Sequence, residues 1–426
     1  MRNIIILLIT VLISSATAAQ KTYIHSGNLL DVKSGKMLQE RTIIISDGRV
    51  EKVVEGFVTP EGPQDRVLNL REMTVLPGLI DMHVHLESET HPNAYLEEFT
   101  LNPADYAFGA VGFADTTLKA GFTTVRDLGG TGVNISLRNA INAGKIPGPR
   151  IFTSGKSLAT TGGHADPTNG RSLELAGDPG PREGVVNGPY EAAKAVRQRY
   201  KNGGDLIKIT ATGGVLSVAK SSSNPQFTLE EIKAITETAA DYGFLVAAHA
   251  HGDEGMQRAV LGGVKTIEHG TLMSEETMEL MKQHNTYLVP TITAGKEVSE
   301  NARIPDYYPA VVVPKALEIG PKIQNTFAKA YEKGVPIAFG TDAGVFPHGE
   351  NAREFAYMVE AGMPAIEAIR SATLTPAKIL EKEKELGQIA PGFYADIIAV
   401  KGNPLEQIDI LQKVIFVMKE GKVYKQ

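Results

Sequence analysis

Two histidines one residue apart end an apolar segment, and this pattern constrains the fold more than any other in the sequence. The segment runs from Thr74 to His85 and reads TVLPGLIDMHVH. Side chains alternate between the two faces of a β-strand, so His83 and His85 point the same way. Two imidazoles therefore meet at the C-terminal end of a predicted strand, which is how a metal site can begin.

Strand and helix signals then alternate along the chain and predict a (β/α)8 barrel. Helical patterns such as 228–242, where Thr228 and Glu231 suit a capping box, separate the strand candidates. An open, doubly wound sheet is the alternative, but the sequence has no GxGxxG after a first strand and no Walker loop. The eight strand candidates are 75–83, 123–128, 150–154, 206–211, 245–250, 266–269, 287–292 and 336–341.

The two ends of the chain lie outside this alternation and read as short strands with turns, such as Asp47-Gly48. Two β segments at opposite ends of a chain can combine into one small sheet domain. We therefore expect a β-sandwich-like domain built from 20–75 and 386–426, with the barrel at 76–385 between them.

Residues 1–19 are predicted to be a signal peptide. A basic start at Arg2 precedes an apolar run from Ile4 to Ile13, and Ala16-Thr17-Ala18 has the small-x-small pattern of a cleavage site. The run is shorter than the ~20 residues that a membrane-spanning helix needs. We expect export, to a periplasm or as a secreted protein, with no stable membrane anchor after cleavage.

Composition limits the possible ligands and partners. The chain has 426 residues, a net charge of −6 and no basic block, which argues against nucleic acid as a partner. It has no cysteine, so disulfides, cysteine nucleophiles and thiolate metal sites are excluded. Any metal would be held by histidine, carboxylate or a less usual ligand.

Five of the eight predicted strands carry a potential ligand where they end, and active sites of barrels lie at that end. A lone histidine in an apolar strand is more often a hydrogen-bonded core residue. The joint occurrence at the same end of so many strands reverses that expectation. The residues are His83, His85, Lys208, His249, His251, His269 and Asp342.

Lys208 is the unusual member of this set. A free ammonium inside a barrel is costly to desolvate, and burial lowers its pKa. A neutral lysine can add carbon dioxide to form a carbamate, whose two oxygens can bridge two cations. The alternative is a lysine that reaches solvent, and spacing alone leaves the two interpretations balanced.

Further candidates follow other strands. Arg126 and Asp127 end the second strand and are interpreted as a structural ion pair. The candidates for substrate contacts, each with a structural alternative, are His164 in a glycine-rich loop, His251, and Gly213 and Gly214, which permit close backbone approach or form a turn.

Five motifs contain these strand-end residues: PGLIDMHVH (77–85), IKITATGG (207–214), AAHAHG (247–252), IEHGT (267–271) and GTDAG (340–344). In these motifs the sequence resembles the amidohydrolase superfamily, in particular the imidazolonepropionase-like branch with its Xaa-Pro dipeptidases and ochratoxin-hydrolysing enzymes. The resemblance covers nearly the whole mature chain.

The resemblance implies two divalent metal ions, with zinc the best match to these ligands and manganese or cobalt compatible. The implied ligands are His83, His85 and Asp342 for the more buried ion, His249 and His269 for the other, and carboxylated Lys208 and a hydroxide as bridges.

The implied reaction is hydrolysis of the amide bond of dipeptides, Xaa-Pro or related, or of N-acyl amino acids. The bridging hydroxide would attack, and Asp342 would pass its proton to the departing nitrogen. The alternatives are a cyclic amidase of the imidazolonepropionase kind and a non-catalytic binding protein on the same barrel. Since members of the family are often multimeric, we also expect a homo-oligomer, of a number that the sequence does not fix.

Overall fold

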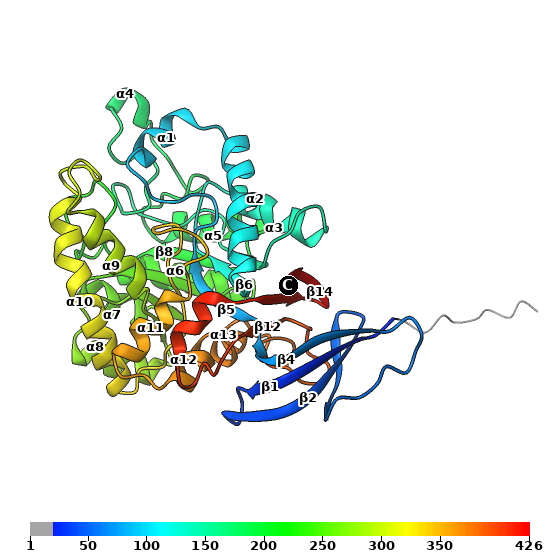
Figure 1. The fold of residues 1–426 in the computed structure, drawn as a ribbon. Helices are drawn as coiled ribbons and strands as arrows, with labels where there is room; N and C mark the ends of the chain where they lie inside the picture. The colour runs from blue at the N-terminus through cyan, green and yellow to red at the C-terminus, as the bar shows by residue number, and fades with distance from the viewer. Residues whose placement is uncertain (1–19) are drawn as a thin grey trace, which may run out of the picture.

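The computed structural model describes residues 20–426, and the predicted signal peptide at 1–19 lies outside them. Figure 1 shows a larger region of mixed helices and strands beside a region of strands that contains both the blue N-terminal strands and the red β14. Within the described residues, no helix has the length and apolarity needed to cross a bilayer.

Strands from both ends of the chain form one seven-stranded sheet in the order β14-β13-β12-β4-β1-β2-β3. Strand β4 joins the two groups, since it pairs in parallel with β1 and antiparallel with β12. This double pairing joins strands from both chain ends in one sheet, and the expected β-sandwich-like domain is a single seven-stranded sheet. The strands are β1 (Thr22–Asp31), β2 (Lys36–Ser46), β3 (Arg49–Glu55), β4 (Arg66–Pro77), β12 (Ile397–Val400), β13 (Phe416–Lys419) and β14 (Lys422–Lys425).

The middle of the chain forms two parallel sheets, ordered β5-β6-β7 and β11-β10-β9-β8. Their strands lie at seven of the eight predicted places, although β5 starts later than expected because β4 continues to Pro77 in the other sheet. The strands are β5 (Leu79–Val84), β6 (Phe122–Asp127), β7 (Arg150–Thr153), β8 (Ile207–Thr210), β9 (Val246–Ala250), β10 (Thr266–His269) and β11 (Tyr287–Val289).

Isolated parallel bridges connect these two sheets. Leu158, which follows β7, pairs with Ile209 of β8. On the other side, Leu288 of β11 pairs with Ile337, and Val84 of β5 pairs with Ala343. The eighth predicted strand, 336–341, is therefore present as bridges and not as a regular strand. Pairing runs in chain order from β5 to this segment and back to β5.

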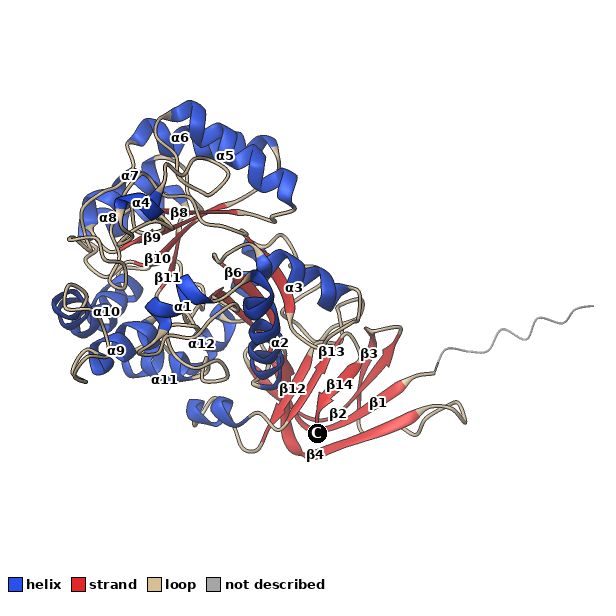
Figure 2. Ribbon diagram, turned by 90° about the horizontal axis from the view of Figure 1, so that it is seen from above, coloured by secondary structure: helices blue, strands red, loops and turns tan. Residues whose placement is uncertain are grey.

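Helices follow most of the parallel strands, and Figure 2 shows α5 to α8 on the outer side of β8 to β11. Helix α6 begins with the predicted capping box, in which Thr228 and Glu231 bond each other's backbone N–H. The helices are α1 (Ala94–Thr100), α2 (Pro103–Lys119), α3 (Val133–Asn142), α4 (Leu173–Ala176), α5 (Pro189–Asn202), α6 (Leu229–Asp241), α7 (Asp253–Leu261), α8 (Glu275–His284), α9 (Ile292–Asn301), α10 (Val313–Glu332), α11 (Arg353–Glu360), α12 (Ala365–Ser371), α13 (Leu374–Ile379) and the 3-10 helix η1 (Ile408–Lys413).

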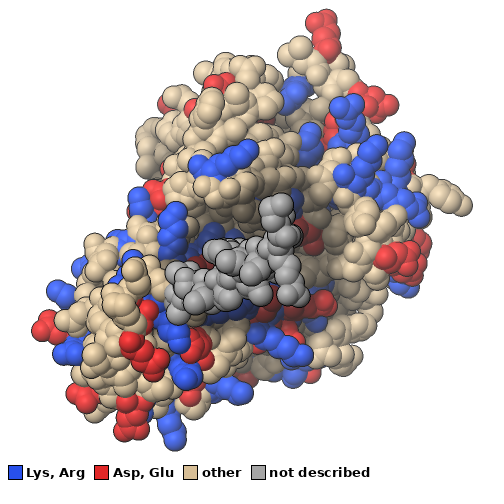
Figure 3. Space-filling model, turned by 90° about the vertical axis from the view of Figure 1, so that its right-hand side faces the viewer, with Lys and Arg blue, Asp and Glu red and all other residues tan. Residues whose placement is uncertain are grey.

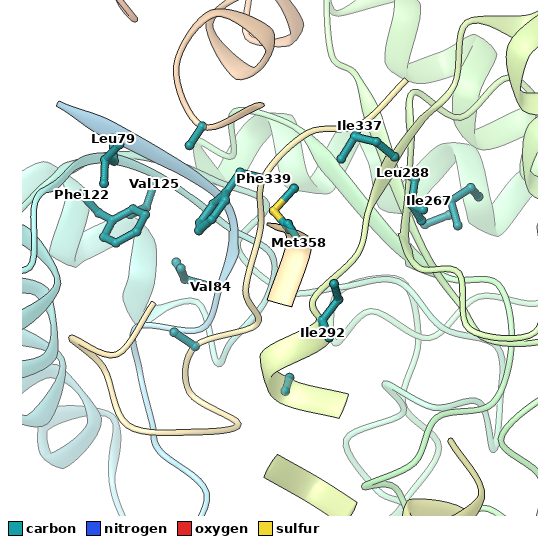
Figure 4. Close-up of a cluster of buried hydrophobic side chains, with 14 of the residues drawn as sticks. Leu79, Val84, Phe122, Val125, Ile267, Leu288, Ile292, Ile337, Phe339 and Met358 are labelled. Atoms are coloured by element: carbon teal, nitrogen blue, oxygen red, sulfur yellow. The ribbon is translucent and has the colours of Figure 1, made fainter. Parts of the chain in front are cut away.

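The main hydrophobic core lies between the parallel strands and these helices. Phe122 and Val125 of β6 are fully buried there, and the Phe122 ring stacks on Phe339 at a centroid distance of 5.6 Å (Figure 4). A separate apolar cluster is formed by side chains of the seven-stranded sheet, with Ile24 and Ile397 among its members. Burial of apolar surface in these clusters stabilises both regions. On the face in Figure 3, acidic and basic side chains are interspersed.

Gly27 provides a test of the pairing between β1 and β4. The register shifts between Ser26 and Asn28, and a Cβ at Gly27 would lie 1.8 Å from the Arg71 carbonyl oxygen. Because a strand would have to move, Gly27→Ala should lower the free energy of unfolding by about 1–3 kcal/mol, measured by urea denaturation.

Gly112→Ala is the matched control for this substitution. Gly112 lies in α2, and a Cβ there would meet nothing within 4 Å. The control should leave stability unchanged or raise it by up to ~1 kcal/mol, because alanine favours the helix. Equal effects of the two substitutions would contradict the β1–β4 contact.

Candidate metal centre

The side chains predicted at the strand ends line one cavity of about 240 Å³. Because parallel strands present their C-terminal ends on one side, residues far apart in sequence meet there. His164 also lines the cavity, whereas Gly213 and Gly214 are not among its lining residues in the described chain. The predicted residues that the cavity brings together are His83, His85, Lys208, His249, His251, His269 and Asp342.

Two groups of possible ligand atoms occur within this set. The nearest donor atoms of His83, His269 and Asp342 lie within 4.8 Å of one another, and so do those of His249, His251 and His269. His269 belongs to both groups and links them. Imidazole nitrogens with a carboxylate oxygen are the ligands that zinc and similar divalent ions take.

Each of four histidines uses one ring nitrogen for a hydrogen bond to the surrounding protein. Bonds of this kind fix the tautomer and the orientation of a metal-binding ring. The second nitrogens of His83 and His85 face other predicted ligands, since both lie within 3.5 Å of Asp342 Oδ1. The bonded atom pairs are His83 Nδ1 with Glu268 Oε2 at 2.9 Å, His85 Nδ1 with the Gly129 carbonyl at 2.8 Å, His269 Nδ1 with Thr291 Oγ1 at 2.7 Å, and His249 Nε2 with the Gly213 carbonyl at 3.1 Å.

The Asp342 carboxylate fits a cation. Its Oδ1 atom faces Nε2 of His85 at 3.3 Å and of His83 at 3.5 Å, yet it is buried without a hydrogen-bond donor. Burial raises the pKa of Asp342, but its interactions with His83 and His85 outweigh burial and leave the pKa below its usual value. A buried carboxylate oxygen without a donor is unfavourable, and a divalent ion would satisfy it.

Burial lowers the pKa values of several bases in the cavity around Asp342. Lys208 is 3% exposed, its Nζ lies 3.4 Å from His83 Nε2, and burial lowers its pKa to about 8. Burial also lowers the pKa of His83 to about 4 and those of His249 and His269 well below their usual value. Neutral imidazole is the form that binds metals.

Three residues of the site have a left-handed backbone that non-glycine residues rarely adopt. They are His269 with φ +72°, Thr291 with φ +51° and Asp342 with φ +61°. Each such conformation costs on the order of 1–3 kcal/mol and persists where surrounding contacts enforce it. Strict alternation would put Glu268 and His269 on opposite faces, but with the left-handed turn at His269 the His269 ring lines the cavity while Glu268 contacts the lining residue His83.

Glu268 is a buried residue of the site that sequence analysis missed. Besides its bond to His83, its Oε1 lies 2.8 Å from Nη2 of Arg126. Burial raises the pKa of Glu268, but Arg126 and His83 outweigh it and hold the pKa at about 2, so Glu268 is a carboxylate at neutral pH. The signal that could have found it is a charged residue inside an apolar strand, one residue before a predicted ligand.

The predicted ion pair between Arg126 and Asp127 is wrong. Adjacent residues on a strand face opposite sides, so these two side chains diverge. Arg126 reaches Glu268, whereas Asp127 accepts hydrogen bonds from the Leu86 backbone and the Asn134 side chain at 2.9 and 2.7 Å.

His164 and His251 lie beside His249. Their ring centroids are 4.4 and 4.7 Å from that of His249. A Cβ at Gly214 would lie 2.2 Å from the His164 ring, and one at Gly213 would lie 1.9 Å from the Ser221 carbonyl. Other parts of the protein, and not a ligand, therefore occupy the space beside these two glycines. The substrate contacts of Gly213 and Gly214 stay predictions.

Comparisons with known proteins identify the class. The profile of the amidohydrolase family matches residues 74–424. Ochratoxinase of Aspergillus niger is 32% identical over 436 residues, which cover 97% of this chain and 88% of that protein. The fold matches a Xaa-Pro dipeptidase crystallised with methionine in its active site, with a TM-score of 0.93 and 53% identity over 96% of this chain and 100% of that one.

A prolidase complexed with N-methylphosphonate-L-proline also matches, with a TM-score of 0.86 and 32% identity over 96% of this chain and 100% of that one. The fold is therefore that of hydrolytic enzymes that act on amide bonds. The chain belongs to the amidohydrolase family. This family generally uses divalent metal ions, and the histidine clusters described above could hold them.

The buried pair of Glu268 and Arg126 gives a stability prediction. Glu268→Gln would leave the Arg126 guanidinium buried without its counter-charge, and we expect a loss of about 3–5 kcal/mol in the free energy of unfolding of the metal-free protein. The measurement is guanidinium denaturation at pH 7. Glu318→Gln breaks an exposed pair with Lys322 and should cost less than about 0.5 kcal/mol.

The difference in unfolding free energy between wild type and Glu268→Gln should also change with pH. The pKa of Glu268 is about 2 in the folded chain against an ordinary value of 4.5, so its charge stabilises the fold above pH 4.5. That contribution is lost as pH falls from 4.5 towards 2. The stability difference between wild type and Glu268→Gln should shrink over this range, and a constant difference would rule out the carboxylate charge as its source.

Proposed function

We propose that this protein hydrolyses the amide bond of dipeptides, Xaa-Pro or related, or of N-acyl amino acids, with the aid of two divalent metal ions. The observation that carries the proposal is the convergence of histidines, one lysine and one aspartate from separate strand ends on a single cavity. The printed activities of the related proteins, a Xaa-Pro dipeptidase, a prolidase and an ochratoxinase, support this substrate class.

The donor atoms suit zinc best, and manganese or cobalt would fit the same ligands. When bound, such ions would polarise the amide carbonyl and provide hydroxide as a nucleophile at neutral pH. The residues proposed to hold them are His83, His85 and Asp342 for one ion, His249 and His269 for the other, and carboxylated Lys208 between the two.

Lys208 is suited to carboxylation. Its amine nitrogen adds to the carbon of carbon dioxide and releases a proton, which gives a carbamate with one negative charge. Only the neutral amine reacts, and burial lowers the pKa of Lys208 to about 8 from an ordinary 10.5, which raises the neutral fraction near neutral pH. The carbamate would add an anion to a cavity where Asp342 is otherwise the acidic lining residue.

Asp342 is proposed as the general base and acid. Its buried Oδ1 has no hydrogen-bond donor and a lowered pKa, so it is ionised and available at neutral pH. It would accept a proton from the attacking water and transfer it to the amide nitrogen as that nitrogen departs. The rings of His83 and His85 beside it are held in place by the hydrogen bonds of their Nδ1 atoms with Glu268 and the Gly129 carbonyl.

We also infer that the ring of parallel pairings is a (β/α)8 barrel, because the bridges at Leu158, Leu288 and Val84 connect its two sheets in chain order. Export is proposed from the pattern of residues 1–19, and a homo-oligomer from the family resemblance. Mass measurement of the mature N-terminus and of the native complex would test both.

A hydrolysis panel tests the proposed reaction. Purified mature protein, reconstituted with zinc or manganese and bicarbonate, would be incubated with Xaa-Pro, Xaa-Arg and Xaa-Phe dipeptides, N-acyl amino acids and cyclic amides, with products read by mass spectrometry. We expect two metals per chain and cleavage of dipeptides or N-acyl amino acids. Ring opening alone would assign a cyclic amidase, and absence of both metal and turnover would return the protein to the binding-protein alternative.

Asp342→Asn tests the proton transfer. The amide keeps the shape of the side chain but cannot accept the proton, so kcat should fall by a factor of about 10²–10⁴ with a smaller change in KM. The rates are measured on samples with matched metal content. Asp409→Asn, at an exposed position in η1, is the control and should leave both constants unchanged. Near-normal kcat in fully loaded Asp342→Asn would show that another group moves the proton.

A further inference from the structure

Lys315 is a buried cation whose hydrogen bonds all go to a loop beside the cavity. It lies in the first turn of α10 and is 6% exposed. Its Nζ donates to the carbonyl oxygens of Gly214, Ser217 and Ala219 at 3.0, 2.5 and 2.8 Å. An ammonium group has three N–H donors, so all of them are used on this loop.

The position of Lys315 is unfavourable for α10 itself. A positive charge in the first turn of a helix opposes the helix dipole, and burial of an ammonium costs solvation free energy. Among the ion pairs of residues 20–426, none involves Lys315, and burial is what lowers its pKa, to about 8. The three carbonyl contacts therefore offset these costs, and they benefit the loop at 214–219.

This loop contributes part of the cavity wall. Val215 and Leu216 line the cavity, and residues 214–219 contain no helix or strand that would hold them in place. The loop is bonded from a second direction, because the Tyr95 hydroxyl of α1 donates to the Leu216 carbonyl. The positions of both apolar side chains thus depend on Lys315 and Tyr95.

The neighbouring part of the wall is fixed by helix packing. Helices α9 and α10 lie side by side (Figure 1), and a Cβ at Gly320 would lie 2.3 Å from Cβ of Ser299. Val298 of α9 and Ile319 of α10 line the cavity and share one hydrophobic cluster with Val215. Ile319 follows Lys315 by one helical turn, so α10 both supplies apolar wall and holds the loop that completes it.

We propose that Lys315 is a positioning residue that holds Val215 and Leu216 in the cavity wall and thereby makes the enzyme select substrates with an apolar side chain beside the scissile amide. This inference rests on the proposed hydrolase function. The substrate side chain would displace water from the wall formed with Val298 and Ile319, and its burial would supply the binding free energy.

Hydrogen exchange tests the positioning without any substrate. In the metal-loaded, full-length mature protein, Lys315→Met should increase exchange of the amides of 214–219 by about tenfold, since the contacts that close this loop are lost. Lys322→Met is the matched control, because Lys322 lies on the same helix but is exposed and bonded to Glu318. Unchanged exchange in Lys315→Met would overturn the proposal.

Kinetics test the selectivity. With Gly-Pro, Met-Pro and Phe-Pro, which share one leaving group, the wild type should prefer the larger side chains. Lys315→Met should reduce that preference in kcat/KM by about tenfold, mainly through the KM of Met-Pro and Phe-Pro. Lys315→Arg keeps the charge and several donors and should restore part of the preference. An equal loss on all three substrates would mark Lys315 as merely structural.

A milder variant covers the case in which Lys315→Met does not fold. Tyr95→Phe removes only the hydrogen bond to the Leu216 carbonyl and should shift exchange and preference in the same direction by a smaller factor. A wild type that binds metal but cleaves neither dipeptides nor N-acyl amino acids would refute the proposed function, whereas the exchange of 214–219 would still decide the role of Lys315.

Discussion

The buried contact between Arg126 and Glu268 holds the centre of this protein together. Arg126 belongs to the sheet of β5 to β7 and Glu268 to the sheet of β8 to β11, so one ion pair of 2.8 Å joins the two halves. The same guanidinium bonds the Met82 carbonyl, and the same carboxylate bonds His83. This pair of charges therefore contributes both to the alignment of the two sheets, beside their backbone bridges, and to the orientation of a candidate metal ligand.

Two features of the site are unfavourable for the free energy of folding. Burial lowers the pKa of Lys208 to about 8 and keeps several histidines uncharged at neutral pH, and the backbone at His269, Thr291 and Asp342 is held in an unfavourable conformation. Both costs are met by the packing of the surrounding strands and helices. In return, the donor groups have few alternative arrangements, and little reorganisation is needed when a ligand arrives.

Strand ends and ligand candidates could be predicted because they depend on local pattern. His83 and His85 share a face by simple alternation, and the motifs around Lys208 and Asp342 carry the family resemblance. Glu268 could not be assigned, since its partners Arg126 and His83 are 142 and 185 positions away in sequence. The same holds for Lys315, whose role depends on a loop about a hundred residues earlier.

The seven-stranded sheet has a consequence for how the chain is made. The hydrogen-bonding partner of β4 on one side is β12, which follows the whole parallel region in sequence. During synthesis from the N-terminus, that edge of β4 leaves the ribosome early and stays open until nearly the last residues emerge. An open strand edge is a site for wrong pairing, so the time needed to translate the intervening segment is also the period in which the newborn chain needs protection.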